Sequence, residues 1–261
     1  MKSTILILVL ITIFISPMDA QIKKQNLILT ADQLTITVVN LRKEISLGKE
    51  VTGTGSFLVK GDAIYIVTAS HVSKDMDDSA YVIIQGENNS PVKIELKKLA
   101  NPIKWINHPI ADLSILKLNP EKVIMETYLQ KRFIPYEMID ISNVAIPRNT
   151  QLTIIGFPLG LGSVGHFSPL TYRTFPSSGL ITLNRFDTNN PQTFIILENP
   201  SIGGYSGAPV YDLSIIESGT MKLTGDGTKL HGFIHGTISD ETGGKLSAIT
   251  PAYYLKDLLE Q

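Results

Sequence analysis

The sequence of 261 residues contains no cysteine. Disulfide bonds, thiolate zinc ligands and lipid attachment to a cysteine are therefore excluded. The metal-binding pattern His-Glu-x-x-His is also absent. We accordingly expect neither a metal nor another cofactor.

An excess of charge of one sign is missing too. Lys and Arg total 23 against 24 for Asp and Glu, the net charge is -1, and no long block of like charge occurs. This balance gives no reason to expect a nucleic-acid or anionic-membrane partner. With 43% hydrophobic residues, the composition is that of an ordinary soluble globular protein.

Long apolar runs are confined to the first 20 residues. There, Lys2 precedes an apolar run with threonines at residues 5–15, and a small residue, Ala20, ends the segment. Because a membrane span needs about 20 apolar residues, this pattern favours a cleaved signal peptide over a transmembrane anchor. We predict cleavage after Ala20, no stable membrane anchor afterwards, and a secreted or periplasmic chain from Gln21. An exported chain without disulfides is more typical of bacteria than of animals.

Short β-branched and aromatic runs fill the first half of the mature chain. They span residues 34–39, 53–59, 63–69, 81–85, 92–96 and 113–118. Six short strands at close spacing favour an antiparallel barrel over βαβ units. Residues 119–148 carry three prolines and little alternation, and we interpret them as a connection to a second barrel.

A second series of runs follows the connection. These runs span residues 151–160, 172–174, 178–184, 193–197, 208–211, 230–238 and 245–249. At the end, Thr250-Pro251 offers a helix start, and apolar residues then recur at helical spacing. The sequence thus predicts an all-β protein with a short helix over 251–261.

One serine is surrounded by glycines in the stretch from Asn199 to Asp212, Asn-Pro-Ser-Ile-Gly-Gly-Tyr-Ser-Gly-Ala-Pro-Val-Tyr-Asp. Glycine permits positive φ and close approach of the main chain. The N–H groups of Gly204 and Ser206 could then point at one oxyanion beside the Ser206 hydroxyl, as acyl transfer requires. Taken alone, the stretch fits a glycine-rich hairpin turn with an idle serine equally well.

Two upstream motifs favour the catalytic interpretation. The run Tyr-Ile-Val-Thr-Ala-Ser-His ends at His71, and Pro-Ile-Ala-Asp-Leu-Ser-Ile-Leu places Asp112 at the mouth of another strand. A serine nucleophile needs a base, commonly histidine, and the histidine needs a carboxylate that fixes its tautomer. The order is His71, Asp112, Ser206, with separations of 41 and 94 residues (71 to 112 and 112 to 206).

With these motifs the chain resembles the trypsin-like serine proteases, whose corresponding separations are about 45 and 93. Thr-Ala-Ser-His, Ala-Asp-Leu-Ser-Ile-Leu and Gly-Tyr-Ser-Gly-Ala-Pro are most similar to the bacterial Deg/HtrA-like branch. The resemblance covers about residues 35–258 and leaves no room for a PDZ module. It implies a chymotrypsin-like fold of two six-stranded antiparallel barrels, over about 34–118 and 149–250, within a domain over 21–261.

The resemblance also implies an activity and its residues. The chain would be a serine endopeptidase acting on proteins or peptides through an acyl-enzyme. Ser206 would be the nucleophile, His71 the base and Asp112 the orienting acid, with Gly204 and Ser206 forming the oxyanion hole. His108 we expect on a loop surface.

Tyr205 departs from the pancreatic trypsins, which carry an aspartate just before the serine. That aspartate pairs with an N-terminal amine released by zymogen cleavage. Because tyrosine cannot form this ion pair, we expect activity without such a cleavage.

The resemblance further implies a substrate slot whose base lies six residues before the serine. Pro200 and Ser201 stand there, and the following wall strand contributes Ile234, His235 and Thr237. Without a gap in the alignment, Ile234 faces the slot and His235 faces the triad near Asp112, which favours an apolar substrate side chain. A bulge in the strand would instead return His235 to the slot, as in glutamyl endopeptidases, and favour Glu or Gln.

Two other functions fit less well. An α/β-hydrolase orders its triad Ser, Asp, His, and only about 55 residues follow Ser206. A protease-like binding module without activity is the alternative from a different class. The natural substrate and the oligomeric state do not follow from the sequence.

Overall fold

The computed structural model describes residues 27–218 and 221–260. The predicted signal peptide, residues 1–20, lies outside the described residues. Within the described part of the chain, no helix has both the length and the apolarity to cross a membrane.

The first sheet contains most strands of the amino-terminal half. In chain order they are β1 (Val38–Ser46), β2 (Lys49–Lys60), β3 (Ala63–Thr68), β4 (Tyr81–Gln85), β5 (Pro91–Glu95), β6 (Trp105–Asn107) and β7 (Ser114–Lys117). Their order across the sheet is β5-β4-β1-β2-β3-β7-β6, with antiparallel neighbours. A two-residue strand, β8 (Ile134–Pro135), pairs in parallel with β2.

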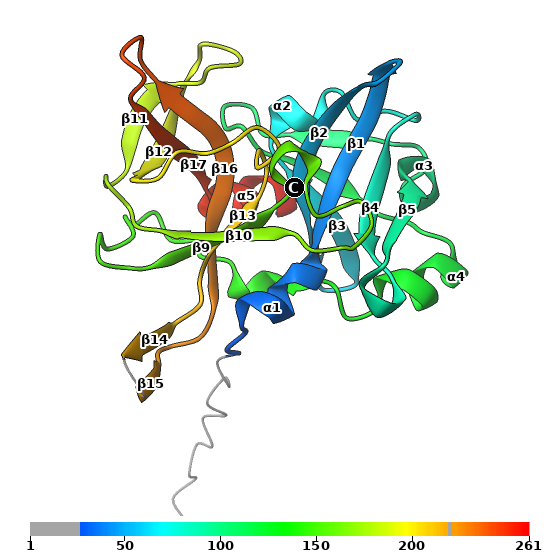
Figure 1. Cartoon of the computed structure of the whole chain (residues 1–261), viewed down its shortest axis with the longest axis horizontal. Coiled ribbons are helices and arrows are strands. Elements are labelled where there is room, and N and C mark those ends of the chain that lie inside the picture. Colours follow the sequence, from blue (N-terminus) through cyan, green and yellow to red (C-terminus); the bar gives the residue numbers. More distant parts are fainter. Residues whose placement is uncertain (1–26, 219–220, 261) are drawn as a thin grey trace, which may run out of the picture.

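The second sheet lies beside the first (Figure 1). It comprises β9 (Leu152–Gly156), β10 (Leu170–Thr174), β11 (Ile181–Asn184), β12 (Pro191–Leu197), β13 (Pro209–Asp212), β16 (Lys229–Ser239) and β17 (Lys245–Pro251). The order is β10-β9-β13-β16-β17-β12-β11, also antiparallel. A separate hairpin, β14 (Ile215–Ser218) and β15 (Met221–Thr224), projects away from the two sheets.

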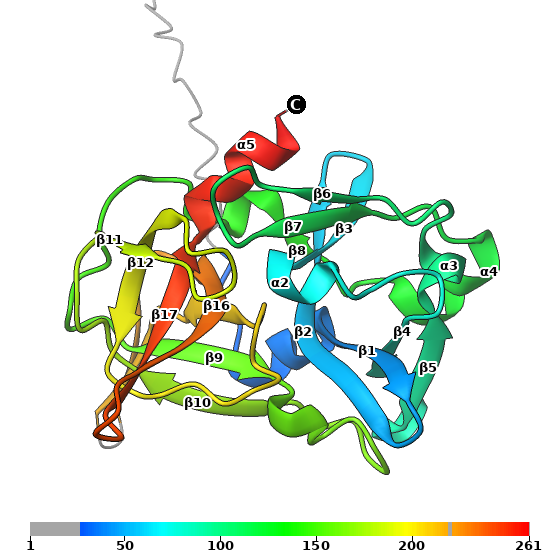
Figure 2. The ribbon, with the colours of Figure 1, turned by 90° about the horizontal axis from the view of Figure 1, so that it is seen from above.

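Helices are few and short. They are α1 (Ala31–Leu34), α2 (Ser70–Ser73), α3 (Leu96–Leu99), α4 (Lys122–Ile124) and the carboxy-terminal α5 (Leu255–Leu259). Figure 2 shows α2 on the side of the first sheet that faces the second.

The predicted all-β architecture of two antiparallel sheets with a short terminal helix is confirmed. The strand count differs from six per barrel, since each sheet has seven strands in its main order. Among the described residues, the two outermost strands of each sheet do not pair with each other, so neither sheet closes into a barrel. The run 34–39 begins with helical turns because Thr30 and Gln33 form a capping box that starts α1. The short strands β6, β8, β14 and β15 lacked a recognisable alternation.

Apolar side chains between the two sheets hold them together. One cluster contains Leu58 and Val67 of the first sheet, Tyr211 and Phe233 of the second, and Leu255 of α5, all at most 1% exposed. Each such side chain stabilises the fold by about 1.5–3 kcal/mol relative to an exposed one. The two sheets and α5 therefore share one hydrophobic cluster at their junction.

Thr54, on β2, makes the polar part of this junction and is fully buried. Its hydroxyl donates to the carbonyl of Gly204 at 2.8 Å and accepts from the N–H of Phe157 at 3.0 Å. Its backbone N–H donates to the carbonyl of Ser206 at 2.9 Å. One residue of the first sheet thus fixes two segments of the second.

We expect Thr54→Val to destabilise the protein by on the order of 2 kcal/mol or more, because it leaves a buried N–H and a buried carbonyl without their partner. Denaturant unfolding measures the loss. Ser56→Ala is the matched control, since the buried Ser56 hydroxyl on the same strand has no hydrogen-bond partner. Equal stability of Thr54→Val and Ser56→Ala would contradict the bridging role.

Candidate active site

His71 is placed where β3 passes into α2. Buried Ala69 and Val72 anchor this turn on either side of it. The backbone N–H of His71 donates to Oδ1 of Asp112 at 3.0 Å, and its Nδ1 lies 2.7 Å from Oδ2. The side chain is 13% exposed. One edge of the imidazole is therefore fixed, and the ring remains accessible.

Asp112 lies in the loop between β6 and β7 and is fully buried. Its backbone N–H donates to Oε1 of Gln192 at 2.6 Å. Nδ1 of His108 accepts a hydrogen bond from the N–H of Ala111 at 2.9 Å and so stabilises the conformation of this loop. His108 is 5% exposed, so the expectation of a surface position was wrong. Its ring packs on Tyr254 and its Nε2 lies 3.1 Å from Asp257, which brings the carboxy-terminal segment against the loop.

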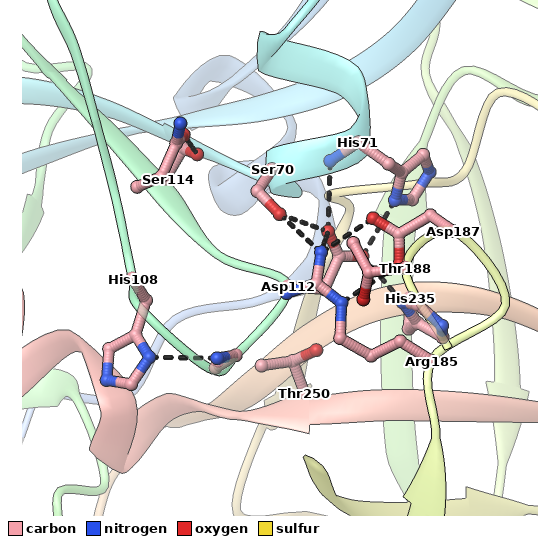
Figure 3. Close-up of polar contacts among 12 residues, drawn as sticks. Ser70, His71, His108, Asp112, Ser114, Arg185, Asp187, Thr188, His235 and Thr250 are labelled. Atoms are coloured by element: carbon pink, nitrogen blue, oxygen red, sulfur yellow. Dashed lines mark hydrogen bonds and ion pairs between the residues drawn. The ribbon is translucent and has the colours of Figure 1, made fainter. Parts of the chain in front are cut away.

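The carboxylate of Asp112 contacts two imidazoles (Figure 3). Nδ1 of His235 lies 2.5 Å from Oδ2, the same oxygen that Nδ1 of His71 approaches. Burial alone would raise the pKa of Asp112, but the hydrogen bonds and charges of His235 and His71 hold that pKa well below its usual range. An ionised carboxylate only accepts hydrogen bonds, so both Nδ1 atoms carry a proton. In neutral His71 this leaves Nε2 free to accept a proton.

The three side chains also qualify as a possible metal site, since their ligand atoms lie within 4.8 Å of one another. Hydrogen bonds from both imidazoles to one oxygen account for this proximity. The donor atoms are occupied with one another, and the arrangement fits an orienting acid.

Ser206 sits in a tight turn before β13. Gly207 has φ +80°, and a Cβ there would clash with Oγ1 of Thr68 and with the carbonyl oxygen of Thr54. Only glycine allows the chain to pass this close to the first sheet. Oγ of Ser206 is 3.5 Å from the carbonyl of His235, and no hydrogen bond among the described residues joins it to the imidazole of His71.

The peptide before Gly204 has a fixed orientation. The carbonyl of Gly203 accepts from the N–H of Leu159 at 2.7 Å. Since C=O and N–H point in opposite directions across a trans peptide, the N–H of Gly204 points away from Leu159. Neither this N–H nor that of Ser206 is a donor in the hydrogen bonds of the described residues. Both donors remain free to bind an oxyanion.

Tyr205 points into the second sheet and is 4% exposed. Its ring packs edge-on against Tyr172 at 5.1 Å, and burial raises the pKa of Tyr205 to about 12. A neutral side chain in apolar surroundings thus anchors the serine turn at the position where the pancreatic enzymes use an ion pair.

The predicted slot residues are distributed over two segments. Pro200 is exposed, Ser201 and Ile234 are buried, and the hydroxyl of Thr237 donates to the carbonyl of Ser201 at 2.8 Å. The pairing of β16 with β17 does shift between Ile234 and Gly236, so a bulge is present. The bulge nevertheless leaves Nδ1 of His235 on Asp112.

Sequence reasoning missed several residues around the carboxylate. Ser70 donates to Oδ1 of Asp112 at 2.7 Å, and Arg185 approaches the same oxygen at 3.3 Å. Gln192 and Thr54 fix the backbones of the acid and serine loops. Ser70 could have been suspected as the neighbour of His71, whereas Arg185 comes from a hairpin 73 residues from Asp112 and carries no local signal.

Comparison with protein families identifies the chain. Residues 53–214 match the model of the trypsin-like peptidase domain, and this range is well over half of the sequence. The chain belongs to this family and is a serine endopeptidase, a hydrolase. No curated relative matches the sequence.

Solved structures share the fold. The active form of the Rv3671c protease from M. tuberculosis superposes with a TM-score of 0.54 at 15% identity, over 88% of this chain and 82% of that one. The serine endoprotease from Yersinia pestis gives 0.52 at 18%, over 89% and 66%, and human heparin binding protein gives 0.53 at 12%, over 90% and 94%. These similarities establish the chymotrypsin-like fold.

Proposed function

We propose that the protein hydrolyses peptide bonds with Ser206 as nucleophile, His71 as general base and Asp112 as orienting acid. The observation that carries the proposal is the short contact between Nδ1 of His71 and Oδ2 of a buried, ionised Asp112. This contact fixes the tautomer that leaves Nε2 free to accept the proton of Ser206.

The reaction proceeds in two halves. Oγ of Ser206 turns from the carbonyl of His235 toward Nε2 of His71, gives up its proton and attacks the substrate carbonyl. The N–H groups of Gly204 and Ser206 stabilise the oxyanion of the tetrahedral intermediate. The C–N bond then breaks, and protonated His71 gives its proton to the leaving amine. A water attacks the acyl-enzyme in the same way, releasing the acid and restoring Ser206.

Export is part of the proposal. The apolar segment that ends at Ala20 supports a signal peptide, and the absence of cysteine favours a periplasmic or secreted bacterial enzyme. The domain would extend over residues 21–261. Since Tyr205 anchors the serine turn without an ion pair to a new amine, the chain from Gln21 is competent as it stands.

We propose an apolar side chain at the substrate position before the scissile bond. Ile234 and Ser201 are both buried, and the imidazole of His235, on the same strand as Ile234, is engaged with Asp112. These neutral side chains give an acidic substrate side chain no cationic partner, and burying an unpaired charge is costly.

We expect a fluorophosphonate probe to label the chain from Gln21 at Ser206, with no further cut. Ser206→Ala and His71→Ala should both lose labelling and peptidase activity while remaining folded, because triad members act as one unit. Peptide mass mapping locates the label, and the exposed Ser46→Ala is the control. A folded Ser206→Ala that kept substantial peptidase activity would disprove the assignment, and labelling only after another cleavage would disprove direct competence.

Cleavage-site profiling on a peptide library tests the slot. We expect small or medium apolar residues before the cut, and we expect His235→Ala to lower the rate on all substrates without changing their ranking. An acidic preference that disappears in His235→Ala would show instead that this imidazole binds substrate.

A further inference from the structure

Arg185, directly after β11, brings a buried cation to the catalytic carboxylate. It is 7% exposed, and its Nη2 lies 3.3 Å from Oδ1 of Asp112 and 2.8 Å from Oγ of Ser70. Its Nη1 donates to the carbonyl of Ile110 at 3.1 Å, two residues before the aspartate. The guanidinium therefore contacts both the acid and the loop that carries it (Figure 3).

A second set of contacts holds Arg185 in place. Asp187 accepts from Nε at 2.9 Å and from Nη2 at 2.6 Å, a bidentate pair whose two side chains are 7% and 8% exposed. Burial would raise the pKa of Asp187, but hydrogen bonds from Arg185 lower it below the usual carboxyl value. Backbone hydrogen bonds of Arg185 with Asn189 and Asn190, both 2.9 Å, close the turn. The cation is thus held by side-chain and backbone hydrogen bonds within its own hairpin.

The two oxygens of Asp112 have separate sets of donors. Oδ1 accepts from the N–H of His71, the hydroxyl of Ser70 and the guanidinium of Arg185. Oδ2 accepts from the two imidazoles, His71 and His235. Fixed donors on one oxygen prevent the carboxylate from rotating, so the other oxygen stays directed at Nδ1 of His71.

We propose that Arg185 is a positioning residue of the protease, which locks Asp112 and opposes protonation of the His71–Asp112 unit. The inference rests on the proposed function. The guanidinium acts through Asp112 and does not itself contact the reacting atoms. Arg185 can take this role because its hairpin extends from the second sheet to the loop of the first sheet that carries Asp112.

The charges around Asp112 determine whether a substitution moves the acid limb of the kcat/KM profile to higher or to lower pH. The charged and titratable groups facing Asp112 are His71 from α2, His235 from β16, and Arg185 with Asp187 from the hairpin. The neutral side chain of Gln192 faces it from β12. In the same loop as Asp112, His108 contacts the carboxylate of Asp257. A fixed cation disfavours a second positive charge on the nearby histidine, and a fixed carboxylate favours it.

Three substitutions separate charge from geometry. Arg185→Gln should lower kcat by about tenfold to a hundredfold with KM nearly unchanged, as expected for a misplaced catalytic group. It should move the acid limb of the kcat/KM profile to higher pH, because the cation is gone and Asp187 remains. Arg185→Lys should keep the limb near its original pH and still lower kcat, because an ammonium lacks the planar fork. Asp187→Asn should move the limb to lower pH.

The double variant Arg185→Gln/Asp187→Asn guards against misfolding, since it leaves no buried carboxylate unpaired. We expect it to lower kcat with little shift of the limb. The control is Arg173→Gln, which removes an exposed arginine from β10 and should change neither quantity.

Wild-type labelling at Ser206 distinguishes failure of this inference from failure of the proposed function. Suppose that the wild-type protein is labelled at Ser206. If a folded Arg185→Gln variant then has the same kcat and the same acid limb as the wild type, the positioning role is wrong. If Arg185→Gln and Asp187→Asn moved the acid limb in the same direction, the proposed electrostatic effect on the His71–Asp112 unit would be wrong.

Discussion

The buried carboxylate of Asp112 is the group on which the site depends. Removing an ionised carboxylate from water costs several kcal/mol, so it persists only where donors surround it. Hydrogen bonds to a charged group contribute about 1.5–3 kcal/mol each, and five donors meet this carboxylate. Three of them come from the first sheet's α2 turn and two from the second sheet. The acid is therefore stable only when both sheets are assembled.

The serine turn depends on the same junction. Thr54 of the first sheet bonds to the carbonyls of Gly204 and Ser206, and Leu159 sets the peptide that presents the N–H of Gly204. The carboxylate of Asp112 and the serine turn are therefore both held by contacts that cross between the sheets. Such a site is preorganised, because the folding contacts that fix it are already made before substrate binds.

Much of this arrangement follows from the sequence. Alternating runs gave most strand positions, and the spacing of His71, Asp112 and Ser206 pointed to one site, because a strand end or a glycine turn leaves a local signature. Arg185 and Thr54 could not be found in this way. Each acts through a tertiary contact, over 73 residues to Asp112 and 150 residues to Gly204, that no local pattern records. His108 was misjudged for the same reason, since the carboxy-terminal segment that buries it lies 149 residues away.

Oδ2 of Asp112 accepts a hydrogen bond from each of two histidines, His71 and His235. Proton NMR of ¹⁵N-histidine-labelled protein observes these ring protons directly. We expect two downfield Nδ1–H resonances protected from solvent exchange, one lost in His71→Ala and the other in His235→Ala. A single protected resonance belonging to His71, with the ring of His235 exchanging freely with water, would contradict the shared carboxylate.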